Sequence, residues 1–177
     1  MKKLFILCVV AFLSTNLFQA QEFPNVKVDV SPMDALMVRN DDKESFMRII
    51  YSRPKKNGRE VFGELVPYGK VWRTGANEAT EITFYKDVNF GGQDVKAGTY
   101  SLFTIPNEKE WTVILNSALN QWGAYRYDES KDVARVTVKP KSTAATVETF
   151  SIASEKDGEN FNLMLGWDDT YVQVPVK

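Results

Sequence analysis

The chain has 177 residues, 44% of them hydrophobic, 12% aromatic and 25% charged, which suits one well-packed domain and is unlike a disordered chain. It has no histidine and one cysteine, Cys8, which excludes a Ser-His-Asp triad and ordinary zinc or copper sites. The formal net charge is −1 and Lys and Arg form no long run, which argues against nucleic acid as a partner.

The N-terminal stretch "MKKLFILCVVAFLSTNLFQAQ" has the three parts of a secretory signal: two lysines, an apolar run from Leu4 to Leu13, and a polar stretch ending at Ala20. The apolar run is short for a membrane span, so we expect cleavage near Ala20 and export to the periplasm or cell exterior. The alternative is an N-terminal anchor that is never cut. Cleavage leaves one domain, residues 21–177, with 20 basic and 23 acidic residues, a net charge of −3 and no cysteine. We expect no transmembrane segment in it.

Helix is scarce in the remaining chain. "SPMDAL" (31–36) places a capping serine before a proline, which predicts one short helical turn. "SALNQWGAY" (117–125) predicts a second, stopped by Gly123.

Alternating apolar and polar residues predict the strands, and turn residues separate them. The expected turns lie at Gly91-Gly92, Ala97-Gly98, Pro106-Asn107, Asp157-Gly158 and Asp168-Asp169. Short strands at this spacing predict an all-β fold, an antiparallel β-sandwich of jelly-roll or immunoglobulin-like type with one or two short helical turns. The predicted strands are 45–52, 81–88, 99–105, 111–116, 134–140, 145–154, 161–167 and 170–176.

Two acidic stretches, "NDDKES" (40–45) and "WDDT" (167–170), lack the spacing of a known calcium loop, and we interpret both as solvated turns. We therefore expect no bound metal and no cofactor. Without histidine or a mature cysteine, catalysis would depend on Asp, Glu, Tyr, Lys, Ser or Arg.

The stretch from Tyr51 to Thr80 is the main candidate for a functional site. Arginine suits a carboxylate, a phosphate or a sugar acid, and Trp or Tyr faces suit sugar rings. The segment from Tyr51 to Thr80 reads as a long, irregular loop. Ordering such a loop costs conformational entropy, so packing or a ligand has to hold it. An alternative is structural: Arg73 pairs with Glu78 or Glu81, and Trp72, taken alone, is favoured as core. The polar candidates are Arg53, Arg59, Arg73, Asn77 and Glu78, set among the aromatic residues Tyr51, Phe62, Tyr68 and Trp72.

Long words of the sequence, among them "GREVFGELVPYGKVWRTGANEATEITF", "AGTYSLFTIP" and "DVARVTVKP", resemble the bacterial family called domain of unknown function 2911 (DUF2911). The resemblance runs from about Ser31 to the C-terminus and implies a secreted or envelope protein of Bacteroidetes type, but no activity. "RNDDKES" (39–45) departs from the Gly- and Thr-containing hairpin usual there. The family's signature falls on Tyr51, Arg53, Pro54, Gly58, Arg59, Phe62, Gly63, Trp72, Arg73, Gly75, Asn77, Glu78, Thr80, Gly98, Tyr100, Trp111, Gln121, Trp122 and Gly123.

Three functions are weighed for this cluster, to which "NQWGAYRY" could add Gln121, Trp122 and Tyr125. The leading interpretation is a secreted, non-enzymatic protein that binds a polar or anionic small ligand or a glycan. The second is a hydrolase or lyase with Glu78 as general base, helped by Arg73 and Arg53 and by a second acid or a tyrosine such as Tyr51 or Tyr68. The third is a buried hydrogen-bonded network of purely structural value. The sequence does not indicate an oligomeric state.

Overall fold

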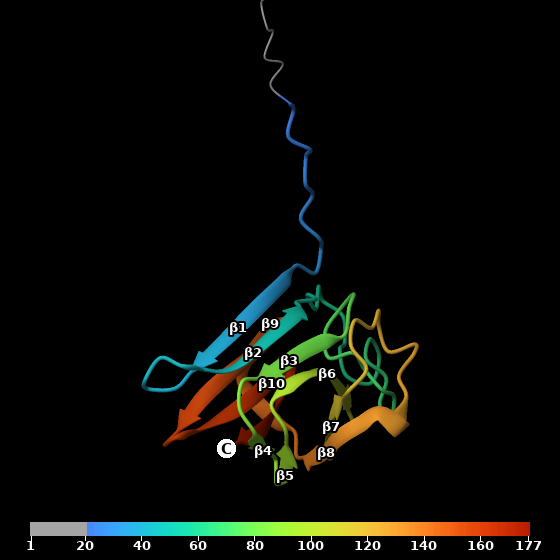
Figure 1. The fold of residues 1–177 in the computed structure, drawn as a ribbon. Helices are drawn as coiled ribbons and strands as arrows, with labels where there is room; N and C mark the ends of the chain where they lie inside the picture. The colour runs from blue at the N-terminus through green and yellow to red at the C-terminus, as the bar shows by residue number, and fades with distance from the viewer. Residues whose placement is uncertain (1–20) are drawn as a thin grey trace, which may run out of the picture.

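The computed structural model describes residues 21–177, and the predicted signal sequence, residues 1–20, lies outside this range. Residues 21–30 form an extended, exposed arm that leaves the body of the molecule (Figure 1). The body is built from ten β-strands and one short 3₁₀ turn, Glu129–Lys131. None of the segments between residues 21 and 177 is a helix of the length and apolarity that crossing a bilayer requires.

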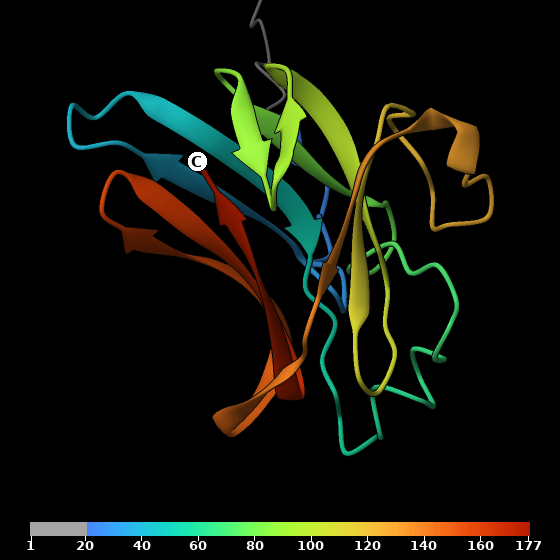
Figure 2. The same ribbon diagram turned by 90° about the horizontal axis from the view of Figure 1, so that it is seen from below.

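Two antiparallel sheets face each other, and the predicted all-β sandwich is confirmed (Figures 1 and 2). They do not close into a barrel. The larger sheet has the order β1(Met33–Arg39), β2(Ser45–Ser52), β3(Thr80–Phe84), β6(Gly98–Ile105), β7(Trp111–Asn116), β8(Asp132–Val138). The smaller sheet has the order β5(Gln93–Val95), β4(Val88–Phe90), β10(Asn160–Val176), β9(Lys141–Asp157). Figure 2 shows the long β9–β10 hairpin curving along the larger sheet.

Alternation along the strands places one row of apolar side chains between the sheets. Ile49 of β2, Val113 of β7 and Leu165 of β10 are fully buried in this core. Aromatic rings connect the layers, because Trp72 stacks on Trp167 with ring centroids 5.9 Å apart and interplanar angle 18°. Since residues 21–177 contain no cysteine, this packing has to hold the sandwich without disulfides among them.

Both predicted helical turns are wrong, because neither residues 31–36 nor residues 117–125 form a helix. Residues 31–36 lead into strand β1, whose residues from Met33 to Val38 pair with Ser52 to Met47 of β2. The ladder of sheet hydrogen bonds outweighs the local capping signal of a serine followed by a proline. Residues 117–125 form a loop instead, because Asn120 (φ 56°) and Gly123 (φ 68°) leave the right-handed helical region. The 3₁₀ turn that does form is capped by Asp128.

Predicted strands 45–52 and 111–116 match β2 and β7 residue for residue. Segment 81–88 is wrong as one strand: β3 ends at Phe84, and β4 begins at Val88. Segments 161–167 and 170–176 are one strand, so the turn expected at Asp168-Asp169 is wrong. The chain instead makes a bulge there, with Asp168 at φ 57°.

Candidate functional site

Most candidate residues lie in the connection between β2 and β3, residues 53–79, which covers one end of the sandwich. Trp72 pairs with Thr104 of β6 through two backbone hydrogen bonds of 2.7 and 2.9 Å. Thr80, eight positions later, pairs with Leu102 of the same strand. Residues 73–79 therefore leave the sheet as a loop between two points fixed on β6, and we call them loop 73–79.

Buried threonines and a glycine hold loop 73–79 in place. Thr74 has φ 55°, an outlier for a β-branched residue, and its hydroxyl bonds that of Thr104 at 3.2 Å. The Thr80 hydroxyl donates to the Thr74 carbonyl oxygen at 2.6 Å. A Cβ on Gly75 would lie 2.9 Å from the carbonyl oxygen of Ser52, so only glycine fits there. This frame fixes the backbone of the neighbouring residue, Arg73.

Arg73 lines a cleft of about 540 Å³, within the size range of small-molecule sites. Lys55 and Arg59 line it too, while no carboxylate does. Asn57 and Asn77 add amide groups, and we call the whole the cationic cleft. Its apolar walls include Leu65, Val66, Trp72 and Trp167. Such a set of donors without an acceptor of opposite charge is suited to an anion.

The Arg73 guanidinium forms no hydrogen bond or ion pair with other groups of residues 21–177. Its Nε is buried and has no hydrogen-bond partner within residues 21–177. Over the same residues, no ion pair joins Arg73 to Glu78 or to Glu81. Glu81 instead accepts a hydrogen bond from the backbone N–H of Asn120 at 2.9 Å. The structural network suggested for Arg73, Asn77 and Glu78 is therefore not formed by their side chains.

Arg53, in contrast, is fully engaged. Its guanidinium bonds the Asp34 carboxylate at 2.9 Å, the Phe150 carbonyl oxygen at 3.2 Å and the Ser151 hydroxyl at 2.9 Å. These partners belong to β1 and β9, so Arg53 connects an edge of one sheet to an edge of the other. It is placed outside the cationic cleft.

Arg59 and Trp72 each line the cationic cleft and also donate hydrogen bonds within the protein. Arg59 is exposed, and its guanidinium donates to the carbonyl oxygens of Lys56 and Lys55 at 2.9 and 2.7 Å. Trp72 is only 8% exposed, and its indole N–H donates to the Gly75 carbonyl oxygen at 3.1 Å. Trp72 is thus a core residue whose edge forms cleft wall, and it presents no open face for stacking.

The structure brings the remaining candidates together at one edge of loop 73–79. Glu78 and Trp122 form an antiparallel bridge, and the N–H of Ala79 donates to the Gln121 carbonyl oxygen at 2.8 Å. Glu78 is exposed and lines a cleft of about 270 Å³ with Asp29 and Trp122. Asn77 donates to the Asp29 carboxylate at 3.2 Å and lines both this cleft and the cationic cleft.

The tyrosines suggested as catalytic partners lie elsewhere. Neither Tyr51 nor Tyr68 lines the cleft that contains Glu78. The Tyr51 hydroxyl is buried and is bonded to the backbone of Ile152 at 3.2 and 3.4 Å. Burial and the charges of Glu108 and Glu60 raise the pKa of Tyr68. Neither tyrosine is therefore a partner for Glu78, whereas a second acid, Asp29, does line the same cleft.

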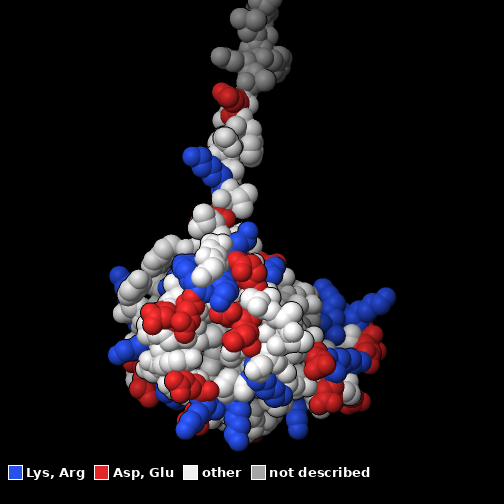
Figure 3. Space-filling view, turned by 180° about the vertical axis from the view of Figure 1, so that it is seen from behind, with Lys and Arg blue, Asp and Glu red and all other residues white. Residues whose placement is uncertain are grey.

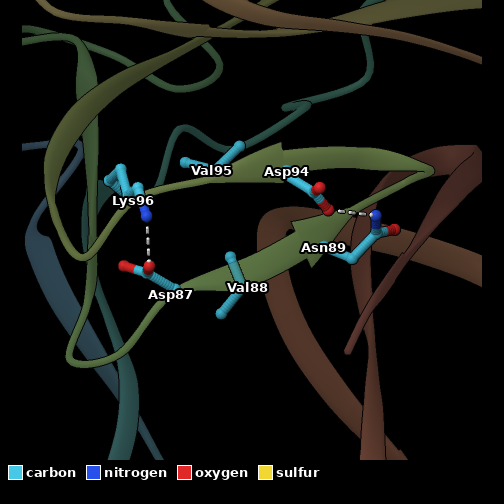
Figure 4. A pocket seen from close by; sticks show the side chains of 6 residues that line it. All are labelled: Asp87, Val88, Asn89, Asp94, Val95 and Lys96. Atoms are coloured by element: carbon cyan, nitrogen blue, oxygen red, sulfur yellow. Dashed lines mark hydrogen bonds and ion pairs between the residues drawn. The ribbon is translucent and has the colours of Figure 1, made fainter.

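A further cleft, of about 330 Å³, lies on the β4–β5 hairpin but has its charges already paired (Figure 4). Lys96 bonds Asp87 at 2.7 Å, and Asn89 bonds Asp94 at 2.8 Å. The hydrogen bonds from Lys96 and from the backbone N–H of Ala97 lower the pKa of Asp87. Because these polar groups already bond one another, this cleft is a weaker candidate for a ligand site than the cationic cleft.

In the described part of the chain, no three acidic side chains gather around a point. Asp168 instead forms an ion pair with Lys56, and both side chains are more than three-quarters buried. Acidic and basic side chains are interspersed over the face in Figure 3, without a large area of one sign.

Lys55, Asn57 and Trp167 line the cationic cleft but were not singled out from the sequence. Lys55 and Asn57 stand between Arg53 and Arg59, so the polar composition of that stretch was a usable signal. No local pattern indicates Trp167, which reaches the cleft through the pairing of β9 with β10.

Comparison with known proteins gives one result. The model of a protein family described as "Protein of unknown function (DUF2911)" matches residues 31–176. No match to the chain was found among curated proteins or among solved structures.

Proposed function

The chain belongs to the DUF2911 family, whose description assigns no activity, and from its own residues we propose that it is a non-enzymatic protein that binds a small organic anion in the cationic cleft. The observation that carries this proposal is the lining of that cleft, with Lys55, Arg59 and Arg73 and no carboxylate. A carboxylate, a phosphate or the acid group of a sugar satisfies such a set of donors.

Arg73 supports the proposal further. A buried guanidinium N–H without a partner costs free energy, because it loses its water and gains no hydrogen bond. An anion in the cleft is expected to accept instead from the terminal guanidinium nitrogens of Arg73, which donate no hydrogen bond to residues 21–177. A half-buried charge pair is also less screened by salt than an exposed one, so the cleft favours anions more than surface lysines do.

The other interpretations have less support. For catalysis by Glu78, neither Tyr51 nor Tyr68 lines its cleft, and the second acid there, Asp29, already accepts hydrogen bonds from the Ser31 backbone N–H and the Asn77 amide. Binding outside the cytoplasm is part of the proposal, and it depends on the signal-like residues 1–20. Outside the cytoplasm, a receptor for anionic nutrients or envelope components needs no catalytic group. The absence of histidine from the sequence agrees with such a role.

The experiment is thermal unfolding of residues 21–177 with a panel of organic acids, phosphates and sugar acids. At a ligand concentration of 100 Kd, a ligand that binds only the native state adds about 2.7 kcal/mol, which raises Tm by roughly 5–10 °C. We expect at least one class of anion to give this shift. Arg73→Ala should lose the shift, whereas Lys139→Ala, which removes an exposed cation outside the described clefts, should keep it. No shift with any anion, or an equal shift in Arg73→Ala, contradicts the proposal.

A further inference from the structure

One smaller cleft adjoins the cationic cleft, and a second smaller cleft shares a residue with the first of these. The cleft of about 270 Å³ shares Ser31 and Asn77 with the cationic cleft, and it also includes Trp122. Trp122 in turn lines a cleft of about 410 Å³ with Tyr125. Each cleft thus shares at least one lining residue with the next, and we call the three together the long groove.

The far end of the long groove presents two aromatic rings to solvent. Trp122 is 62% exposed and Tyr125 is 84% exposed. Their backbone is nevertheless fixed, since the N–H of Gly123 donates to the Asn77 carbonyl oxygen at 2.9 Å and Trp122 bridges Glu78. The Tyr125 ring lies against Gly123, where a Cβ would come within 2.7 Å of it. Exposed aromatic rings carried on a hydrogen-bonded backbone offer contact area and are typical of binding surfaces.

The polar groups beside these rings suit a sugar. Asn120, Gln121 and Arg126 line the same cleft and supply amide and guanidinium groups that can bond hydroxyls. An aromatic face packs against the apolar face of a sugar ring, while its neighbours bond the ring's edge. A volume of about 410 Å³ suits a small ring better than a flat protein partner.

Charge changes along the long groove. The first cleft holds Lys55, Arg59 and Arg73, while the middle cleft holds the carboxylates of Asp29 and Glu78. Carboxylates accept hydrogen bonds from hydroxyls but repel a second anion. We therefore infer that the ligand is an oligosaccharide with one acidic group at its end: the acid lies in the cationic cleft, neutral hydroxyls bond Asp29 and Glu78, and a neutral ring stacks on Trp122. This inference rests on the proposed function.

The test is binding of residues 21–177 to an immobilised array of neutral, singly acidic and polyanionic oligosaccharides, followed by calorimetry with the strongest. We expect binding confined to chains with one terminal acid. Trp122→Ala should weaken it at least about tenfold, and Trp122→Tyr should restore most of the affinity. Tyr85→Ala, which removes an exposed aromatic residue outside the described clefts, should leave affinity unchanged.

Other outcomes overturn the inference. Equal binding of neutral chains or of polyuronates would contradict the charge pattern, and so would a Trp122→Ala variant with unchanged affinity. Self-association that disappears in Trp122→Ala would mean that the rings contact protein instead. If free organic anions bind in an Arg73-dependent manner while the array stays blank, the inference fails and the proposed function stands. If neither binds, both fail.

Discussion

At the scale of single residues, substitution of Arg73 distinguishes a binding role for this side chain from a structural one. Its buried Nε has no partner within the described chain, so the guanidinium costs stability in the unliganded protein. Arg73→Met keeps the apolar stem and removes the unsatisfied group. We expect an unfolding free energy equal to the wild type or higher by about 1 kcal/mol, measured by urea denaturation. A loss of more than about 1 kcal/mol would instead identify Arg73 as a structural lock.

A second residue-level prediction concerns Tyr127. Burial and a 2.6 Å hydrogen bond to Asp132 raise its pKa above the usual value of about 10. The folded protein therefore keeps this proton when the unfolded chain loses it, so the stabilisation is present below pH about 10 and is lost as pH rises further. We expect the unfolding free energy to fall more steeply above pH 10 in the wild type than in Tyr127→Phe. Identical slopes in chemical denaturation would contradict this assignment.

At the scale of elements, loop 73–79 determines where Arg73 lies. Gly75→Ala places a Cβ against the carbonyl oxygen of Ser52, and no flexible side chain can give way. We expect a loss of about 1–3 kcal/mol of stability, and weaker anion binding, because the loop must shift. Gly158→Ala is the matched control, since its φ is also positive but its Cβ meets nothing within 4 Å. Equal effects of the two variants on anion affinity would show that the loop frame is not what positions Arg73.

Elements were predictable from sequence where one face is buried along a whole strand. Ile49 and Tyr51 alternate with less buried residues in β2, so its ends could be predicted. Strand β1 could not, because its "SPMDAL" signal is local while its pairing with β2 is not. Loop 73–79 was recognised as polar, but its contacts with Thr104 and Gln121 come from distant parts of the chain. Pattern reasoning on one sequence has no access to such pairings.

At the scale of the whole molecule, two edges of the sandwich are tied by side chains. Arg53 bonds Asp34 of β1 and the Phe150 carbonyl oxygen of β9. Gln93 of β5 bonds the backbone of Arg135 in β8 at 2.6 and 3.3 Å. These hydrogen bonds join the two sheets along both edges, in addition to the packed core between them.

Arg53→Met should therefore lower global stability by about 2 kcal/mol, because charge-assisted hydrogen bonds to both sheets are lost. Arg53→Lys should not restore it, since lysine cannot reproduce the planar fork. Urea unfolding gives both values, and anion binding by the folded variants should be retained. Loss of binding without loss of stability would place Arg53 in the site rather than in the frame.

The central claim, that the cationic cleft binds an anion through Arg73, is tested most directly by calorimetric titration. The strongest organic anion from the thermal panel is titrated into wild type, Arg73→Ala and Lys139→Ala at low and physiological salt. We predict binding to wild type and Lys139→Ala, and affinity at least about a hundredfold lower in Arg73→Ala, as expected for a lost charge-assisted contact in a half-buried site. The same affinity in all three proteins, with Arg73→Ala folded, would contradict the account.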